Sequence, residues 1–364
     1  EMLRDAEAYL SELHEIAAGN LKEQNYERSL RIFAALLRSH RIHHGELHPL
    51  VGTALHNMGV VYLRAECHSD ALDCFGRAVR VRKGAIGRDH PDVAVSLVKV
   101  GICHLLLRSY DSALLTFREA LSVRRHALGH LHPSTARVYN NIGCVHVEFA
   151  EMRQARRAFE AALDVQRNAM CEDPGNRALM FGAATTLCNL GYLYRHREMY
   201  GKAALVLNEA VSLQEVVLGP SHSTVLATLD SLADAHFQND DCAGAIKSYE
   251  SILGRFGNLD SSGGSADGRE GQEQQQGSAD DDGGDGEALV LRRRRSRAAA
   301  MVLYKMSRVH LRQNDLEAAL NKLRAALGHV RGLGGNNVEA LEAKLEADIT
   351  RIAERHESSQ LEWV

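Results

Sequence analysis

Histidines form the first pattern that could support chemistry. His43, His44 and His48 stand close together in the chain, and imidazole nitrogens are common ligands of zinc and other transition metals. The cluster has no second set of ligands beside it, and the seven cysteines are scattered without a Cys-x-x-Cys pair. Reduced, dispersed thiols of this kind do not indicate a zinc site or a disulfide framework. We therefore expect no metal and no cofactor.

Motifs of known enzymes are also missing from the sequence. It has no Gly-rich phosphate loop, no G-x-S-x-G and no His-Glu-x-x-His, the patterns of nucleotide binding, acyl transfer and zinc hydrolysis. The formal net charge of -4 provides no overall field that would attract nucleic acid or anionic lipid. We find neither a long apolar run nor a secretory leader. These observations predict a cytoplasmic protein that is not an enzyme and has no membrane partner.

The histidines instead mark a repeat. His-Pro recurs at His48-Pro49, His90-Pro91 and His132-Pro133, at a constant spacing of 42 residues. A residue that returns at a fixed period serves the repeated structure, so we assign these histidines to a turn and helix cap rather than to a metal. The same spacing carries a glycine and an aromatic residue, at Gly59, Gly101 and Gly143 and at Phe75, Phe117 and Phe159.

Each repeat predicts two helices. Two stretches of about 15 residues with apolar side chains at i, i+3, i+4 and i+7 are separated by a short polar turn. A glycine on the first helix, opposed by an alanine on the second, lets the two helices approach closely, and we expect the aromatic residue to fill the gap against the next repeat. The frame extends back to Phe33 and, after six extra residues between Cys171 and Arg177, forward to Tyr249 and Leu323. The sequence thus predicts an all-α solenoid of about seven helix pairs.

One segment interrupts the repeats. Residues 257–288 are rich in Gly, Gln and acidic residues and show no apolar periodicity, which predicts a disordered insert. We expect repeats 1–6 in residues 1–256, repeat 7 in residues 289–331 and a C-terminal capping helix in residues 336–357. The basic run Arg292 to Arg297 is typical of a solvated helix start, a phosphate-binding patch, a kinase site at Ser296 or a nuclear-import signal. It leaves a nuclear location open as the alternative to the cytoplasm.

Two stretches resemble a known family: HPLVGTALHNMGVVYLRAECHSDALDCFGRAVRVRKGAIGRDHP and HPSTARVYNNIGCVHVEFAEMRQARRAFEAALDVQR. They look like the 42-residue tetratricopeptide repeats (TPRs) of kinesin light chains and their relatives. The resemblance covers Pro49 to Ala169 strongly and Leu187 to Leu253 moderately. It implies a right-handed superhelical solenoid of TPR-type helix pairs whose first helices line a concave groove that binds peptide segments of partner proteins. It does not imply association with a motor.

The resemblance also implies which residues line the groove. They stand around the small residue of each first helix and comprise Asn57, Lys99, Asn140, Asn141, Asn189, Arg64, Arg137, Tyr192, Arg195 and Lys305. A row of asparagine amides, which both donate and accept, can hold the backbone of an extended peptide. The basic members favour a peptide with acidic character. The alternative for the asparagines is that they are solvated or bond to the preceding turn.

We therefore expect a scaffold or adaptor that binds an extended peptide of a partner protein. Two alternatives belong to other classes: a helical-repeat protein that binds RNA, and an assembly component that associates with itself. Glu148, Asp230 and Asp234 at groove positions, together with few aromatic residues, speak against nucleic acid. The sequence leaves the oligomeric state open.

Overall fold

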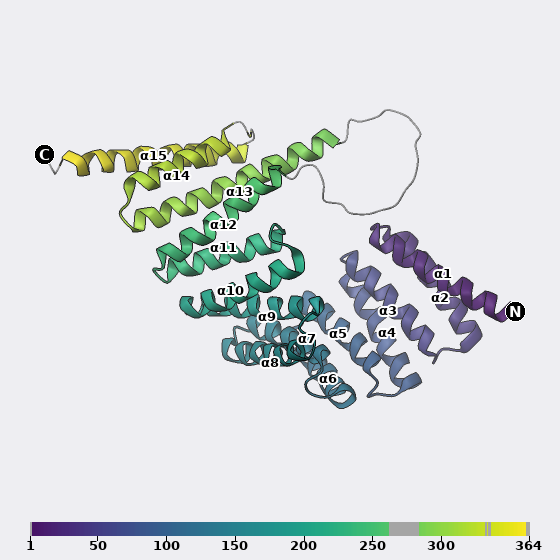
Figure 1. Ribbon diagram of the computed structural model, residues 1–364. Coiled ribbons are helices and arrows are strands. Elements are labelled where there is room, and N and C mark those ends of the chain that lie inside the picture. Colours follow the sequence, from purple (N-terminus) through teal and green to yellow (C-terminus); the bar gives the residue numbers. More distant parts are fainter. Residues whose placement is uncertain (1, 262–283, 332, 334–335, 362–364) are drawn as a thin grey trace. The chain divides into compact units, whose positions relative to one another are not determined.

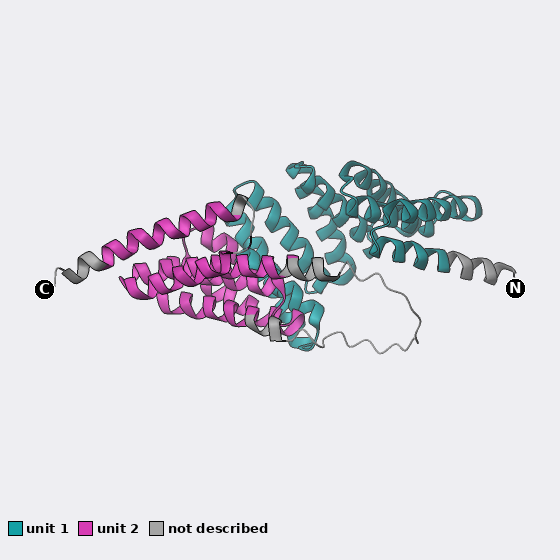
Figure 2. Cartoon of the chain, turned by 90° about the horizontal axis from the view of Figure 1, so that it is seen from above, with its two compact units in different colours: residues 1–190 teal, residues 191–364 magenta. Residues whose placement is uncertain are grey.

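The computed structural model describes residues 2–261, 284–331, 333 and 336–361. The chain forms two compact units, unit 1 (Glu1–Leu190) and unit 2 (Gly191–Val364) (Figure 2). Every regular element in the described part is an α-helix (Figure 1). The predicted all-α class is confirmed.

The helices follow one another as antiparallel pairs. Unit 1 contains α1 (Met2–Lys22), α2 (Tyr26–His44), α3 (Pro49–Arg64), α4 (His68–Ile86), α5 (Pro91–Leu106), α6 (Tyr110–Leu128), α7 (Pro133–Glu148), α8 (Met152–Glu172) and most of α9 (Arg177–His196). Unit 2 contains the end of α9, then α10 (Tyr200–Leu218), α11 (Ser223–Gln238), α12 (Cys242–Ser261), α13 (Gly284–Arg312), α14 (Leu316–Val330) and α15 (Asn336–Leu361). Helices α1 to α14 make the predicted seven pairs, and α15 packs against α14 as the terminal helix.

Helical structure reaches into both edges of the predicted insert. Helix α12 continues to Ser261 and α13 begins at Gly284, while the intervening residues 262–283 lie outside the described residues. The run Arg292 to Arg297 therefore lies within α13 rather than at its start. The disorder predicted for residues 257–288 stays a prediction.

The recurring histidines begin the first helices. His48, His90, His132 and His222 are N-cap residues, and Nδ1 of each ring accepts a hydrogen bond of 3.2–3.3 Å from the backbone N–H two residues later. In three of these helices proline follows the histidine, at the position where a missing N–H costs nothing. The predicted turn and cap role is confirmed.

Backbone geometry fixes the turns at the repeat spacing. Within a pair, the chain reverses through a residue with positive φ, as at Glu66 and Arg108 with φ of 60° and 57°. Between pairs it reverses through a glycine, as at Gly87 and Gly129 with φ of 93° and 88°, where other residues would be strained. The 42-residue register is therefore set by both kinds of turn.

A buried polar residue lies near the end of several second helices, at a position that we call the strut position. Arg82 on α4 donates from Nη1 to the backbone oxygen of Asp92 at 2.9 Å and to Oγ of Ser96 at 2.8 Å, both on α5. Arg124 on α6 makes the corresponding bond to the backbone oxygen of Ser134 on α7. These bonds join one helix pair to the next. The strut position comprises His40, Arg82, Arg124, Gln166 and Gln214, each at most 7% exposed.

Burial affects the charge of these arginines. Burial, together with the neighbouring charge of Arg137, lowers the pKa of Arg124 to about 10. Burial also lowers the pKa of Arg82. Both guanidinium groups still keep their protons near neutral pH, so hydrogen bonds from a buried cation hold the pairs together.

The glycines of the first helices face the aromatic residues of their partners. A Cβ atom added at Gly143 would lie well inside contact distance of the buried Phe159 ring, and the same holds for Gly101 against Phe117. The helices of a pair thus approach as closely as the missing side chain permits. The predicted close approach of the two helices is confirmed, whereas the ring, predicted to fill the gap to the next pair, lies directly against the glycine of its own pair.

We expect Gly143→Ala to destabilise the protein by ~1 to 3 kcal/mol, because the added methyl group would overlap the buried Phe159 ring and force it to shift. Urea unfolding followed by circular dichroism measures the change. Gly76→Ala on α4 is the control, since nothing lies within 4 Å of its added Cβ, and it should stabilise the helix slightly. Equal stability of the Gly143 variant and the wild type would contradict the packing described.

Candidate functional site

The described part of unit 1 contains a pocket of about 590 Å³ lined mainly by the first helices α5, α7 and α9. Four of the ten predicted groove residues line it: Lys99, Arg137, Asn140 and Asn141. Its apolar lining includes Ile102, Leu179 and Phe181, and the Phe181 side chain is 46% exposed. The pocket thus combines cationic, amide and apolar groups within one concave surface.

Gln166 of α8 forms part of the pocket wall and occupies the strut position. Glutamine is shorter than the arginines found there in the two preceding pairs, and its side chain lines the pocket. Gln166 is 4% exposed, and its Oε1 has no hydrogen-bond partner within the described residues. A buried acceptor without a partner is costly. A ligand that donates a hydrogen bond would satisfy it.

Positive charge gathers at this pocket. The pKa of Lys99 is lowered, first by burial and then by the charges of Arg137 and Arg64. None of the three cations forms an ion pair within the described residues. An anion placed beside them would relieve this repulsion and raise the pKa of Lys99 again.

His56 lies near Lys99 and Arg82. Burial, together with the charges of these two residues, lowers the pKa of His56 to about 4. The ring is therefore neutral at pH 7 and makes a 3.2 Å hydrogen bond with Oγ of Ser96. It contributes no positive charge to the pocket.

The predicted asparagine row is only partly brought together. Nδ2 of Asn189 donates to Oδ1 of Asn140 at 2.9 Å, so these two amides already bond to each other across α7 and α9. Asn141 lines the pocket beside them. Asn57 and Arg64 lie on α3 and are not part of the pocket wall. Whether any of these side chains binds a ligand stays a prediction.

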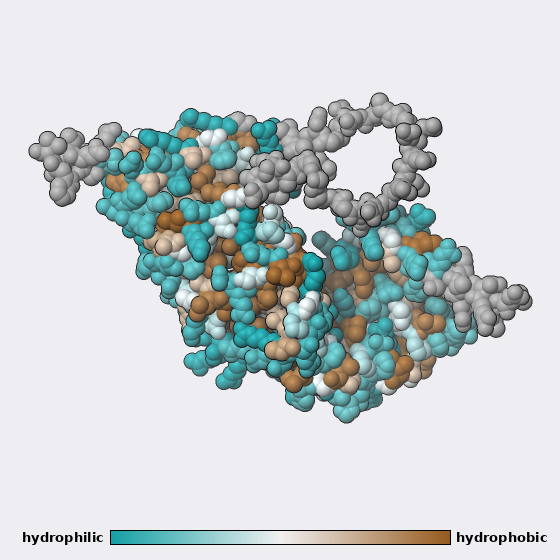
Figure 3. Space-filling view, in the orientation of Figure 1, coloured by the Kyte–Doolittle hydropathy of each residue, from teal (hydrophilic) through white to brown (hydrophobic). Residues whose placement is uncertain are grey.

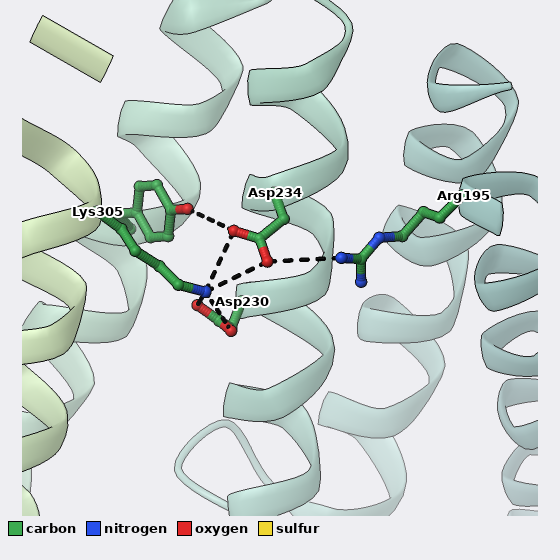
Figure 4. Close-up of polar contacts among 5 residues, drawn as sticks. Arg195, Asp230, Asp234 and Lys305 are labelled. Atoms are coloured by element: carbon green, nitrogen blue, oxygen red, sulfur yellow. Dashed lines mark hydrogen bonds and ion pairs between the residues drawn. The ribbon is translucent and has the colours of Figure 1, made fainter. Parts of the chain in front are cut away.

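The predicted cations of unit 2 have partners inside the protein. Nζ of Lys305 lies 2.7 and 2.8 Å from the two carboxylate oxygens of Asp230, and 3.2 Å from both oxygens of Asp234 (Figure 4). Nη2 of Arg195 lies 3.5 Å from Oδ2 of Asp234. Two carboxylates therefore offset the charges of two cations.

The buried hydroxyl of Tyr249 also belongs to this network of charged groups. Tyr249 stands where α2, α4, α6 and α8 carry phenylalanine, and it is 1% exposed, so its hydroxyl needs a partner. It donates to Oδ1 of Asp234 at 2.8 Å. Its pKa is raised by burial and by the carboxylate of Asp234. The remaining predicted residue, Tyr192, is 57% exposed, with its ring centroid 6.3 Å from that of His196.

Sequence reasoning did not identify Gln166 or Phe181 as pocket residues. A signal for Gln166 was present, because Arg82 and Arg124 recur at the repeat spacing and Gln166 follows them in the same frame. Phe181 is harder to recognise, since an apolar residue on a first helix is usually buried.

Other kinds of site find less support in the described residues. No group of three or more His, Cys, Asp or Glu side chains there is arranged to hold a metal ion. No helix in those ranges is both long and apolar enough to cross a membrane. Apolar and hydrophilic residues are interspersed over the described part of the face in view (Figure 3).

Comparison with known proteins identifies the repeat. A family model described as "Tetratricopeptide repeat" matches residues 5–84, 50–126, 116–168 and 182–256. The chain belongs to the tetratricopeptide repeat family. This fold generally serves as a scaffold for interactions between proteins. No curated protein matches the sequence.

Solved structures agree on the fold. BtubC (BKLC) from P. vanneervenii is 13% identical, with a TM-score of 0.55 over 70% of this chain and 99% of that one. The C-terminal part of a TPR repeat-containing protein from Cytophaga hutchinsonii is 11% identical, with a TM-score of 0.54 over 90% of this chain and 98% of that one. Putative kinesin light chain repeats from Podosopora anserina reach only 0.49 at 16% identity, over 58% and 98%. At these identities the likeness shows the fold alone.

We expect Asp234→Asn to lower the free energy of unfolding by ~1 to 3 kcal/mol, because the variant removes a carboxylate that accepts bonds from Lys305 and Tyr249. Urea unfolding measures the loss. Asp240→Asn is the matched control: Asp240 pairs with Arg312 at 2.7 Å, but its side chain is 75% exposed, so little should change. Equal free energies of unfolding for the two variants would contradict a stabilising role of this network in unit 2.

Proposed function

We propose that unit 1 binds an extended segment of a partner protein, with an acidic side chain of that segment beside Lys99 and Arg137. The observation that carries this proposal is a pocket whose cations have no anionic partner within the described residues. Carboxylates are the abundant anionic groups of proteins, and charge-assisted bonds to them are strong. The interaction should weaken as salt rises, because both partners are partly exposed.

The polar and apolar parts of the pocket support a peptide as the ligand. Asn141 offers an amide that both donates and accepts, and Oε1 of Gln166 lacks a donor. A peptide backbone supplies N–H and C=O groups for both. Phe181 and Leu179 suit an apolar side chain next to the acidic one. The chain would then act as an adaptor, as its resemblance to kinesin light chain repeats suggests.

Unit 2 differs in its electrostatics. Lys305 and Arg195 are paired with Asp230 and Asp234, so an acidic ligand would have to compete with two built-in carboxylates. We therefore assign the acidic contact to unit 1.

Peptide display against the full chain tests the proposal. Selected peptides should be enriched in Asp and Glu. The double variant Lys99→Met, Arg137→Met should weaken their binding by roughly 10- to 100-fold in fluorescence anisotropy, because each charge-assisted bond contributes ~1.5 to 3 kcal/mol and water replaces part of it.

The control is Arg153→Met, Arg157→Met, which removes the same charge from exposed positions on α8 outside the pocket wall. Equal binding by the two double variants would contradict the proposed site. Selected peptides without acidic residues would contradict the proposed ligand. Tight binding of RNA that the first double variant loses would favour the nucleic-acid alternative.

A further inference from the structure

A series of histidine rings runs through the first helix pair. The ring of His14 on α1 lies 6.3 Å from that of His40 on α2, centroid to centroid. His40 lies 6.0 Å from His44, and His44 stacks on His48 at 4.4 Å. Three elements, α1, α2 and the start of α3, thus contribute rings to one cluster, which we call the histidine stack (His14, His40, His44 and His48).

His40 is the buried member of the stack and occupies the strut position. It is 2% exposed, and neither ring nitrogen has a hydrogen-bond partner within the described residues. In the next two pairs this position holds an arginine bonded to the following first helix. The first junction therefore lacks the polar bond that its neighbours have.

The groups whose charges act on the His40 ring are all histidines. They are His14 from α1, His43 and His44 from α2, and His48 from the start of α3. Burial lowers the pKa of His40 most, and each of these four lowers it further. Burial also lowers the pKa of His14, whose ring packs against Phe33 at 5.6 Å. No carboxylate is among the groups that act on His40, so a proton there would have no counter-charge.

Within the described residues, no three of these side chains are placed to hold a metal ion. The imidazole ring of histidine takes up a proton near neutral pH.

We propose that the first helix pair is a pH-sensitive element, which loosens from α3 as pH falls through the range in which histidine takes up a proton. In the closed helix pair, the buried His40 ring is neutral and has no polar partner. In the opened pair, water hydrates the ring. The opened form therefore binds protons more readily than the closed form.

The direction of the effect follows from this difference. The pKa of His40 is lower in the closed form than the ordinary 6.5, so the opened form carries more bound protons between these two values. Stability then increases with pH in that window. Above pH 6.5 the closed pair keeps its full stability. As the pH falls below 6.5, this stability decreases, and the decrease ends once the pH is below the pKa of His40 in the closed form.

Hydrogen–deuterium exchange on the full chain tests the proposal, with exchange times scaled for the intrinsic effect of pH. Peptides from α2 (Tyr26–His44) report on the element, and those from α6 (Tyr110–Leu128) serve as the internal reference. From pH 7.5 to 5.5, exchange in α2 relative to α6 should rise by up to about tenfold for His40 alone, because the opened imidazole is by then mostly protonated.

His40→Gln should remove most of this rise, since glutamine does not titrate and already fills the strut position at Gln166. His44→Gln, at an exposed position of the stack, should reduce the rise in part, and it serves if the first variant does not fold. His126→Gln, an exposed histidine on α6, should leave the rise unchanged. An α2 that responds to pH no more than α6, or a rise that survives both stack variants, would overturn the proposal.

Discussion

In unit 1, a buried polar side chain near the end of a second helix contributes to how one helix pair meets the next. Apolar side chains of α4 to α8 form one buried cluster that spans neighbouring pairs. Arg82 and Arg124 add directional contacts at these junctions by donating to backbone oxygens of the next first helix. A buried guanidinium that loses this acceptor would retain the cost of desolvation. The bond therefore favours one distance and one register of neighbouring pairs.

Variation at this one position gives the junctions different properties. Arginine closes the junctions that follow α4 and α6. Glutamine at Gln166 is too short to do the same, and the pocket with Lys99 and Arg137 opens beside it. Histidine at His40 leaves two ring nitrogens without partners and joins a stack of titratable rings. A structural contact, a candidate binding pocket and a candidate pH response thus arise from the same place in the repeat.

The two units differ in how the charges of their groove cations are balanced. In unit 2, Asp230 and Asp234 lie on α11 opposite Lys305, and the hydroxyl of Tyr249 completes the network. In unit 1, the equivalent cation Lys99 has Arg64 and Arg137 as its charged neighbours. The difference between a neutralised groove and a cationic one therefore depends on a few carboxylates. Those carboxylates contribute stability in one unit, and their absence leaves charge available in the other.

The fold could be predicted from the sequence because its determinants are local and periodic. His-Pro caps, glycines at turns and the pairing of glycine with phenylalanine each leave a mark every 42 residues. The site could be predicted only in part, because it depends on exceptions to the period. The amide of Asn189 bonds to Asn140, and Lys305 is paired with two aspartates. Such pairings depend on side chains 49 and 75 residues away, and a single repeat does not reveal them.

Urea unfolding of Arg124→Gln tests the role of the strut position most directly, with Arg118→Gln, at an exposed position on the same helix, as the control. The strut account predicts that the Arg124 variant loses ~1.5 to 3 kcal/mol, the contribution expected of a hydrogen bond from a buried charged group, while the control keeps its midpoint. Unchanged stability of the Arg124 variant, or an equal loss in both variants, would contradict the claim that this buried bond joins the helix pairs.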